Sequence, residues 1–451
     1  MNPDKFSRWT RLMEKSEGAL TILQIKDRLF TETLLEKRRT SKTIDDVALE
    51  TRVKSIIEEV KAKGDMALID FTKKFDGVDL ATKGVKVSEK EVSDACSRVS
   101  KDEIDALKSL KKKIEKIERP KLKRMTYSIK ESGFRIINTL RPIESVGCYV
   151  PGGEAAYPST LLMTAVPAKV AGVPRIVVCS PPTCGGEINP LILAAASICD
   201  VDEVYRFGGA QAIAALAYGT RTVKPVAKIV GPGNKFVTLA KVMVSRNTAI
   251  DLPAGPSEIV VLADETANPK FVALDMISQS EHAPDNIAGL VTTSNEFAKA
   301  VVGEVEKLVP KMGRRDVVVE SLSNNGFIVL FENMDEAVSF VNAFAPEHLE
   351  IITRKCRKVA DKVASAGLIL LGKYTPVAAS DYCFGTNHVL PTSGFGRVYS
   401  ELSVFDYVRR LSLVKCSKER LRKMRNMVRV LSESEGLPNH FSAIGGRYAD
   451  A

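Results

Sequence analysis

The sequence predicts an α/β protein that has two sheets and a helical arm at each end. From residue 143, apolar runs of strand length alternate with glycine turns and helical segments, which is typical of a parallel sheet covered by helices. A second series of such runs follows residue 257, whereas both ends of the chain carry a helical pattern. A length of 451 residues corresponds to about two to four domains.

The first 130 residues are predicted to be helical and basic. Gly64 is placed to end one helix, whose apolar face carries Val53, Ile56, Ile57 and Val60. Ser88 and Glu91 form a capping-box pattern that opens a helix running into the lysine-rich segment 109–124. That segment lacks aromatic residues, which favours a solvated helix face over a nucleic-acid patch.

Three glycine loops follow predicted strands in the central region. They are Gly152-Gly153, Gly208-Gly209-Ala210-Gln211 and Gly231-Pro232-Gly233-Asn234. Glycine allows a ligand to approach the backbone, and the N-terminus of a helix attracts phosphate. The dinucleotide fingerprint G-x-G-x-x-G and the P-loop pattern are both absent, so tight turns are the alternative interpretation.

The alternation of strand-length apolar runs with turns and helices resumes after residue 257. Asn268 and Pro269 begin a helix that ends near Ser280. The predicted strands are SEIVVLAD, AGLVTTS, GFIVLFE, HLEIIT and AGLILLG, and an amphipathic helix occupies 417–436.

Composition excludes several classes of protein. Hydrophobic residues make up 45% and charged residues 27%, which is ordinary globular composition. No run reaches the roughly 18–20 apolar residues of a membrane helix, and the N-terminus lacks the apolar core of a signal peptide. The eight cysteines contain no C-x-x-C pair, which indicates reduced, mostly buried thiols in a cytoplasmic protein and no cysteine zinc site.

The chain has only four histidines, and three of them lie near other possible metal ligands. Gln279 and His282 share a helix face, Asp381 and His388 bracket a glycine-containing loop, and His440 follows Glu435. Imidazoles, a carboxylate and an amide oxygen would make a mixed metal site, with surface or hydrogen-bonded histidines as the alternative.

Glu347 and His348 follow Pro346 and offer two proton acceptors of different basicity. The alternative interpretation of Pro346-Glu347-His348 is the start of a helix, because proline and glutamate are favoured in the first helical turn.

Eight segments together resemble the histidinol dehydrogenase family. They are GCYVPGGEAAYPSTLLMTAVPAKVAGV, FGGAQAIAALAYGT, KIVGPGNKFVT, IDLPAGPSEIVVLAD, ISQSEHAPD, FAPEHLEI, SDYCFGTNHVLPTSG and EGLPNH. The resemblance covers the chain from about residue 45 to residue 440. The resemblance implies oxidation of L-histidinol to L-histidine in two NAD-dependent steps, through an aldehyde that stays bound. Ser380 departs from the family pattern, which has glycine there.

The resemblance also implies roles for individual residues. The zinc ligands would be Gln279, His282, Asp381 and His440, and the zinc would orient the substrate. His348 would be the general base and Glu347 would activate water. Substrate would also contact Ser257, His388 and Glu435, and NAD would contact Tyr149, Gln211 and Asn234.

The implied architecture has two Rossmann-like α/β domains, one inserted in the other, and helical extensions. The divisions are a helical arm at 1–25, a first domain at 26–148 and 258–402, an inserted NAD domain at 149–257, and a helical arm at 403–451. A homodimer is implied in which that last arm completes the partner's active site.

Two other functions stay open at this point. A related zinc- and NAD-dependent dehydrogenase could act on another polar alcohol, such as a dihydroxypropane sulfonate. The net charge of +10 permits nucleic-acid binding, but the complete set of histidines favours histidinol.

Overall fold

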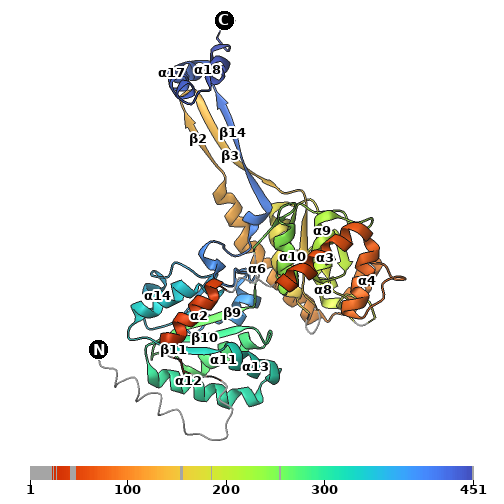
Figure 1. Ribbon diagram of the computed structural model, residues 1–451, viewed down its shortest axis with the longest axis vertical. Coiled ribbons are helices and arrows are strands. Elements are labelled where there is room, and N and C mark those ends of the chain that lie inside the picture. Colours follow the sequence, from red (N-terminus) through yellow and green to blue (C-terminus); the bar gives the residue numbers. More distant parts are fainter. Residues whose placement is uncertain are drawn as a thin grey trace.

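The computed structural model describes residues 23, 25–26, 28–40, 47–152, 156–183, 185–252 and 255–448. They form two α/β lobes and a projecting arm (Figure 1). The predicted α/β class is therefore confirmed. Of the predicted N-terminal helical arm, residues 1–22 and 24 lie outside the described residues, and Ile25 belongs to a short strand.

The first lobe, called here the His348 lobe, contains a parallel six-stranded sheet. In spatial order its strands are β1 (Ile25–Lys26), β11 (Phe327–Leu330), β10 (Ile287–Thr292), β9 (Glu258–Ala263), β12 (His348–Ile352) and β13 (Leu368–Leu371). Its main helices are α2 (Arg28–Thr40), α11 (Pro269–Ser280), α12 (Asn295–Leu308), α13 (Arg315–Asn325) and α14 (Met334–Phe344). Two apolar clusters pack on the sheet, one around Met276 and one around Phe344.

The second lobe, called here the glycine-loop lobe, contains a parallel five-stranded sheet. In spatial order its strands are β6 (Glu203–Arg206), β5 (Ile176–Ser180), β4 (Val146–Tyr149), β7 (Lys228–Val230) and β8 (Ala249–Ile250). The central helices are α7 (Pro158–Ala171), α8 (Pro190–Ile198), α9 (Gly209–Tyr218) and α10 (Lys235–Val244). The chain moves outward from β4 to β6 and then returns to β7, so the order switches between β4 and β7.

The N-terminal helices pack differently from the predicted division, which placed 26–148 with 258–402. Helices α3 (Val47–Lys63), α4 (Asp65–Asp76), α5 (Glu89–Ser97) and α6 (Lys101–Met125) lie on the glycine-loop lobe. The predicted face that includes Val53 and Val60 is buried, and it contributes to the same core as α9 and α10. A second capping box, at Ser100 and Glu103, starts α6, so the predicted single basic helix is two helices.

The arm is partly a sheet, which corrects the prediction of a helical segment at 403–451. Its antiparallel strands lie in the order β14 (Val408–Cys416), β3 (Phe134–Pro142) and β2 (Tyr127–Glu131). Helices α17 (Lys418–Ser434) and α18 (Pro438–Gly445) form its tip, far from both lobes (Figure 1). Nearly all of β14 is exposed, so it has no alternation of buried and exposed residues from which a strand could be predicted.

The remaining short elements connect these parts. They are α15 (Cys356–Ala360), α16 (Val377–Ala379), the π-helical turn η3 (Ser380–Phe384), and the 3-10 turns η2 (Val309–Lys311), η4 (Phe395–Arg397) and η5 (Val404–Tyr407). The described cysteines are free, but only Cys148, Cys179 and Cys199 are buried, so the expectation of mostly buried thiols was wrong. None of the described helices combines the length and apolar character needed to span a bilayer.

Candidate active site

A cavity of about 460 Å³ lies where the two lobes meet. Leu107, Tyr157 and Ser159 line it from the glycine-loop lobe, whereas His282 and Tyr382 line it from the His348 lobe. Among the described residues, His282 is the one predicted site residue that lines this cavity directly, and Tyr382 follows the predicted ligand Asp381.

His348 is the first residue of β12, which excludes the helix start considered for Pro346-Glu347-His348. Its Nδ1 lies 3.1 Å from the backbone oxygen of Glu258, which fixes that nitrogen as the donor. Its Nε2 is buried and makes no hydrogen bond to the described residues. Burial lowers the pKa of His348, so the neutral imidazole presents an available lone pair at Nε2.

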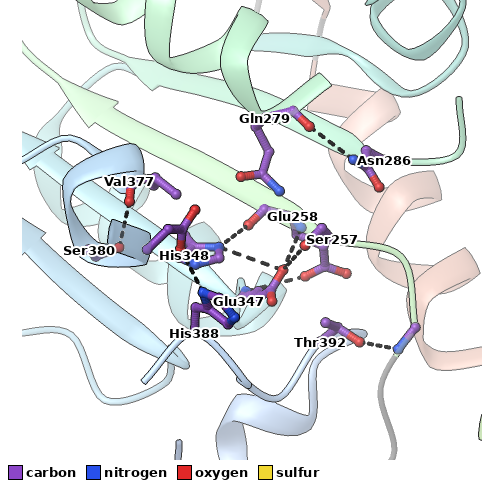
Figure 2. A network of polar contacts seen from close by, with 12 residues as sticks. Ser257, Glu258, Gln279, Asn286, Glu347, His348, Val377, Ser380, His388 and Thr392 are labelled. Atoms are coloured by element: carbon purple, nitrogen blue, oxygen red, sulfur yellow. Dashed lines mark hydrogen bonds and ion pairs between the residues drawn. The ribbon is translucent and has the colours of Figure 1, made fainter. Parts of the chain in front are cut away.

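Glu347 is buried beside His348, and one carboxylate oxygen, Oε2, accepts two hydrogen bonds (Figure 2). The donors are the Ser257 hydroxyl at 2.9 Å and the Glu258 backbone N–H at 2.8 Å. Burial raises the pKa of Glu347 to about 8, and the Glu258 N–H opposes that rise. Burial thus favours the protonated form of Glu347, whereas the hydrogen bonds from Ser257 and Glu258 favour the carboxylate.

Three imidazoles and a carboxylate gather in this region. Asp381, in the turn η3, has its pKa raised to about 6 by burial, with His348 opposing the rise. His388 Nδ1 lies 3.8 Å from Asp381 Oδ1, and its Nε2 lies 3.2 Å from the hydroxyl of Thr160. Burial lowers the pKa of His388 to about 4, helped by His348 and His282. Burial also lowers the pKa of His282, so these rings are neutral near pH 7.

Gln279 is buried in the last turn of α11. Its backbone oxygen accepts a hydrogen bond from Asn286 Nδ2 at 2.9 Å, and its side chain points toward His348 (Figure 2). Gln279, His282 and Asp381 thus bring one amide, one imidazole and one carboxylate to the region. Imidazole and carboxylate are common zinc ligands, whereas an amide oxygen is an unusual one. The described part of one chain does not itself gather three or more His, Cys, Asp or Glu side chains around a metal position.

The last two predicted residues lie elsewhere in the same chain. Glu435 is the C-cap of α17 and His440 lies in α18, and both are exposed at the tip of the arm. Figure 1 shows this tip far from both lobes. A single chain therefore does not bring Glu435 or His440 to the other predicted residues.

The predicted NAD residues lie at the carboxyl ends of β4, β6 and β7. Tyr149 ends β4, and its hydroxyl accepts the Gly209 N–H at 3.1 Å. Gln211 is buried in the first turn of α9, and its Oε1 makes no hydrogen bond to the described residues. Asn234 caps α10 by accepting the backbone N–H groups of Phe236 and Val237.

The glycine loop after β7 is held by a buried ion pair between Lys241 and Asp251. Asp251 accepts the Gly231 N–H at 2.7 Å, and Lys241 donates to the Gly231 carbonyl at 2.9 Å. Gly231 has a φ of 113°, and a Cβ there would overlap the backbone oxygen of Tyr149. Sequence patterns gave no signal for Lys241 or Asp251. The loop lies at the switch point, where parallel sheets generally bind ligands.

A polar site between two α/β lobes, beside the switch point of a parallel sheet, is typical of an enzyme that acts on a small molecule. The profile of the histidinol dehydrogenase family matches residues 37–448. The chain therefore belongs to the histidinol dehydrogenase family, which is a family of oxidoreductases.

Individual relatives are similar over most of their length. The chain is 46% identical to histidinol dehydrogenase of Clostridium acetobutylicum over 88% of this chain and 91% of that protein. It is 43% identical to histidinol dehydrogenase of Methanothermobacter thermautotrophicus over 93% of this chain and 99% of that protein. The crystal structure of histidinol dehydrogenase from Elizabethkingia anophelis matches with a TM-score of 0.89 and 34% identity, covering 95% of this chain and 99% of that one.

Proposed function

We propose that the protein oxidises L-histidinol to L-histidine through bound L-histidinaldehyde, using two NAD+ and a zinc ion. The observation that carries the proposal is the buried Nε2 of His348 beside Glu347, which has no partner among the described residues, in a chain of this family. Two different proton acceptors at one position match a reaction that removes protons in two chemically distinct steps.

In the alcohol step, His348 Nε2 takes the hydroxyl proton. The contact of Nδ1 with the Glu258 carbonyl keeps the proton of the neutral ring on Nδ1, which leaves Nε2 free to accept. In the aldehyde step, Glu347 takes a proton from the water that adds to the carbonyl carbon. The hydrogen bonds from Ser257 and the Glu258 N–H aim the carboxylate and stabilise its charged form.

NAD would lie in the crevice beside Tyr149, Gln211 and Asn234. Gln211 Oε1, which has no hydrogen-bond partner in the described part of the chain, and the close backbone approach at Gly231 support this placement. When bound, NAD+ accepts the hydride that leaves the substrate carbon.

Zinc would be held by Gln279, His282 and Asp381, with His440 of a second copy of the chain as the fourth donor. The buried carboxyl of Asp381, whose pKa is raised, supports a cation there, since a cation would relieve that cost of burial. When bound, zinc orients the substrate. Ser257, His388 and Glu435, the last from the second copy, would complete the substrate contacts.

The exposed apolar surface of the arm supports a homodimer. Leu413, Val414, Val430 and Leu431 are between 45% and 61% exposed on β14 and α17. Large apolar side chains left exposed on a projecting arm are typical of a surface that another chain covers.

The test is NADH formation by the purified protein from L-histidinol and NAD+, followed by absorbance. We expect two NADH per histidinol, loss of activity with a chelator, and recovery with zinc. A dihydroxypropane sulfonate serves as the competing substrate. NADH from the sulfonate and none from histidinol would contradict the proposal.

A further inference from the structure

Arg38, on helix α2, makes a buried ion pair at the start of β9. Its NH1 and NH2 lie 2.8 and 2.6 Å from the two carboxylate oxygens of Glu258, and the two side chains are 7% and 1% exposed. Arg38 also donates to the backbone oxygens of Phe344 at 2.5 Å and Ala345 at 3.2 Å. Its guanidinium lies 3.7 Å from the centre of the Phe344 ring, so packing holds it as well.

These contacts control the turn that leads into Glu347 and His348. Ala345 ends α14 with a φ of 50°, in the left-handed region that non-glycine residues rarely adopt. Arg38 binds the two carbonyls at this turn, and Pro346 follows directly. The direction in which the chain leaves the turn therefore depends on Arg38.

Glu258 contacts Glu347 and His348 through its backbone N–H, its backbone carbonyl and its carboxylate. Its N–H donates to the Glu347 carboxylate at 2.8 Å, and its carbonyl accepts the His348 ring N–H at 3.1 Å. Its carboxylate accepts the Glu347 backbone N–H at 3.3 Å and the Ser393 N–H at 3.0 Å. Any rotation of Glu258 would therefore displace the proton acceptors of both steps.

We propose that Arg38 and Glu258 are positioning residues, which hold the side chains of Glu347 and His348 in the orientation that both oxidation steps require. The inference rests on the proposed function for its kinetic part. Their side chains bind each other and backbone groups of the turn and of Glu347, so we expect them to act on the geometry of the acceptors. The alternative is an ion pair that only stabilises the fold.

The chain offers a matched control for that alternative. Arg175 lies 2.6 Å from Glu203 at the start of β6 and donates to the backbone oxygens of Pro225 and Lys224, both at 3.0 Å. It thus binds one carboxylate and two carbonyls, as Arg38 does, but at the opposite end of a strand from the proposed cofactor crevice. Arg175→Met should lower stability and leave turnover unchanged.

The experiment compares Arg38→Met, Arg38→Lys and Arg175→Met with the wild type. We expect Arg38→Met to lower kcat by roughly 10²-fold with little change in KM for either substrate, since a displacement of about 1 Å has this effect on catalysis. Arg38→Lys keeps the positive charge but loses the planar pair of N–H donors that binds both carboxylate oxygens. Its kcat should therefore lie between those of Arg38→Met and the wild type. A kcat for Arg38→Met equal to that of Arg175→Met, or a change confined to KM, would overturn the inference.

A second measurement does not depend on turnover. The chain has four histidines, so its imidazole ¹⁵N NMR spectrum is simple, and His348→Asn assigns one signal. We expect a single Nδ1–H tautomer for His348 in the wild type and in Arg175→Met, and a mixture in Arg38→Met and, to a lesser degree, in Arg38→Lys. Unchanged tautomers in both Arg38 variants would also overturn the inference. A wild type without activity on histidinol would contradict the proposed function alone, because the spectrum still tests the role of Arg38.

Discussion

Replacing Gly231 with alanine tests whether the glycine loop after β7 binds NAD. The backbone there has a φ of 113°, and the added Cβ would overlap the Tyr149 carbonyl oxygen. Keeping the loop in place would cost about 1–3 kcal/mol in backbone strain alone. Moving it would weaken the bonds to Asp251 and Lys241, each worth about 1.5–3 kcal/mol because it involves a charged group.

We expect the loop to shift, because a backbone carbonyl on β4 cannot yield as a flexible side chain would. A loss of about 3 kcal/mol in NAD binding corresponds to roughly 10²-fold in Kd, which titration calorimetry can measure. Histidinol binding should be unchanged. Gly303→Ala is the control, since nothing lies within 4 Å of its added Cβ. A wild-type Kd for NAD in Gly231→Ala would refute the placement of the cofactor.

The other predictions concern the two proton acceptors. His348→Asn should slow alcohol oxidation by about 10²–10⁴-fold without changing NAD binding, measured by calorimetry. Glu347→Gln should slow oxidation of added histidinaldehyde more than that of histidinol; an equal loss would exclude its water-activating role. Burial raises the pKa of Glu347 from 4.5 to about 8, so the stability from its protonation is complete below pH 4.5 and lost as pH rises through about 8. The thermal midpoint of metal-free Glu347→Gln should therefore fall less than that of the wild type over this range.

The sequence was sufficient for elements whose side chains are buried on one face or both. The runs that became β9, β10, β11 and β12 are almost entirely buried, and such continuous apolar runs predict buried strands of a parallel sheet. Strand β14 pairs over its full length with β3 yet is exposed along it, so it gave no such signal. Its existence depends on a partner strand more than 250 residues earlier in the chain.

The candidate site likewise contains residues that the sequence could identify and residues that it could not. Glu347 and His348 stand together in the sequence, and the family resemblance assigned their roles. Arg38 and Glu258 are 220 positions apart, and each by itself is an ordinary charged residue in a helix or at a strand end. Only the folded chain brings them together, which is why local patterns could not identify them. The packing of α3 and α4 on the glycine-loop lobe was missed for the same reason.

The most direct test of the account is whether two chains share each active site. His348→Asn and His440→Ala should each be inactive alone, the first for lack of the base and the second for lack of a metal ligand. Random exchange of subunits at equal amounts should restore about a quarter of wild-type activity, because half the dimers are mixed and each has one intact site. No recovery after confirmed exchange would contradict a site completed by the arm of a second copy.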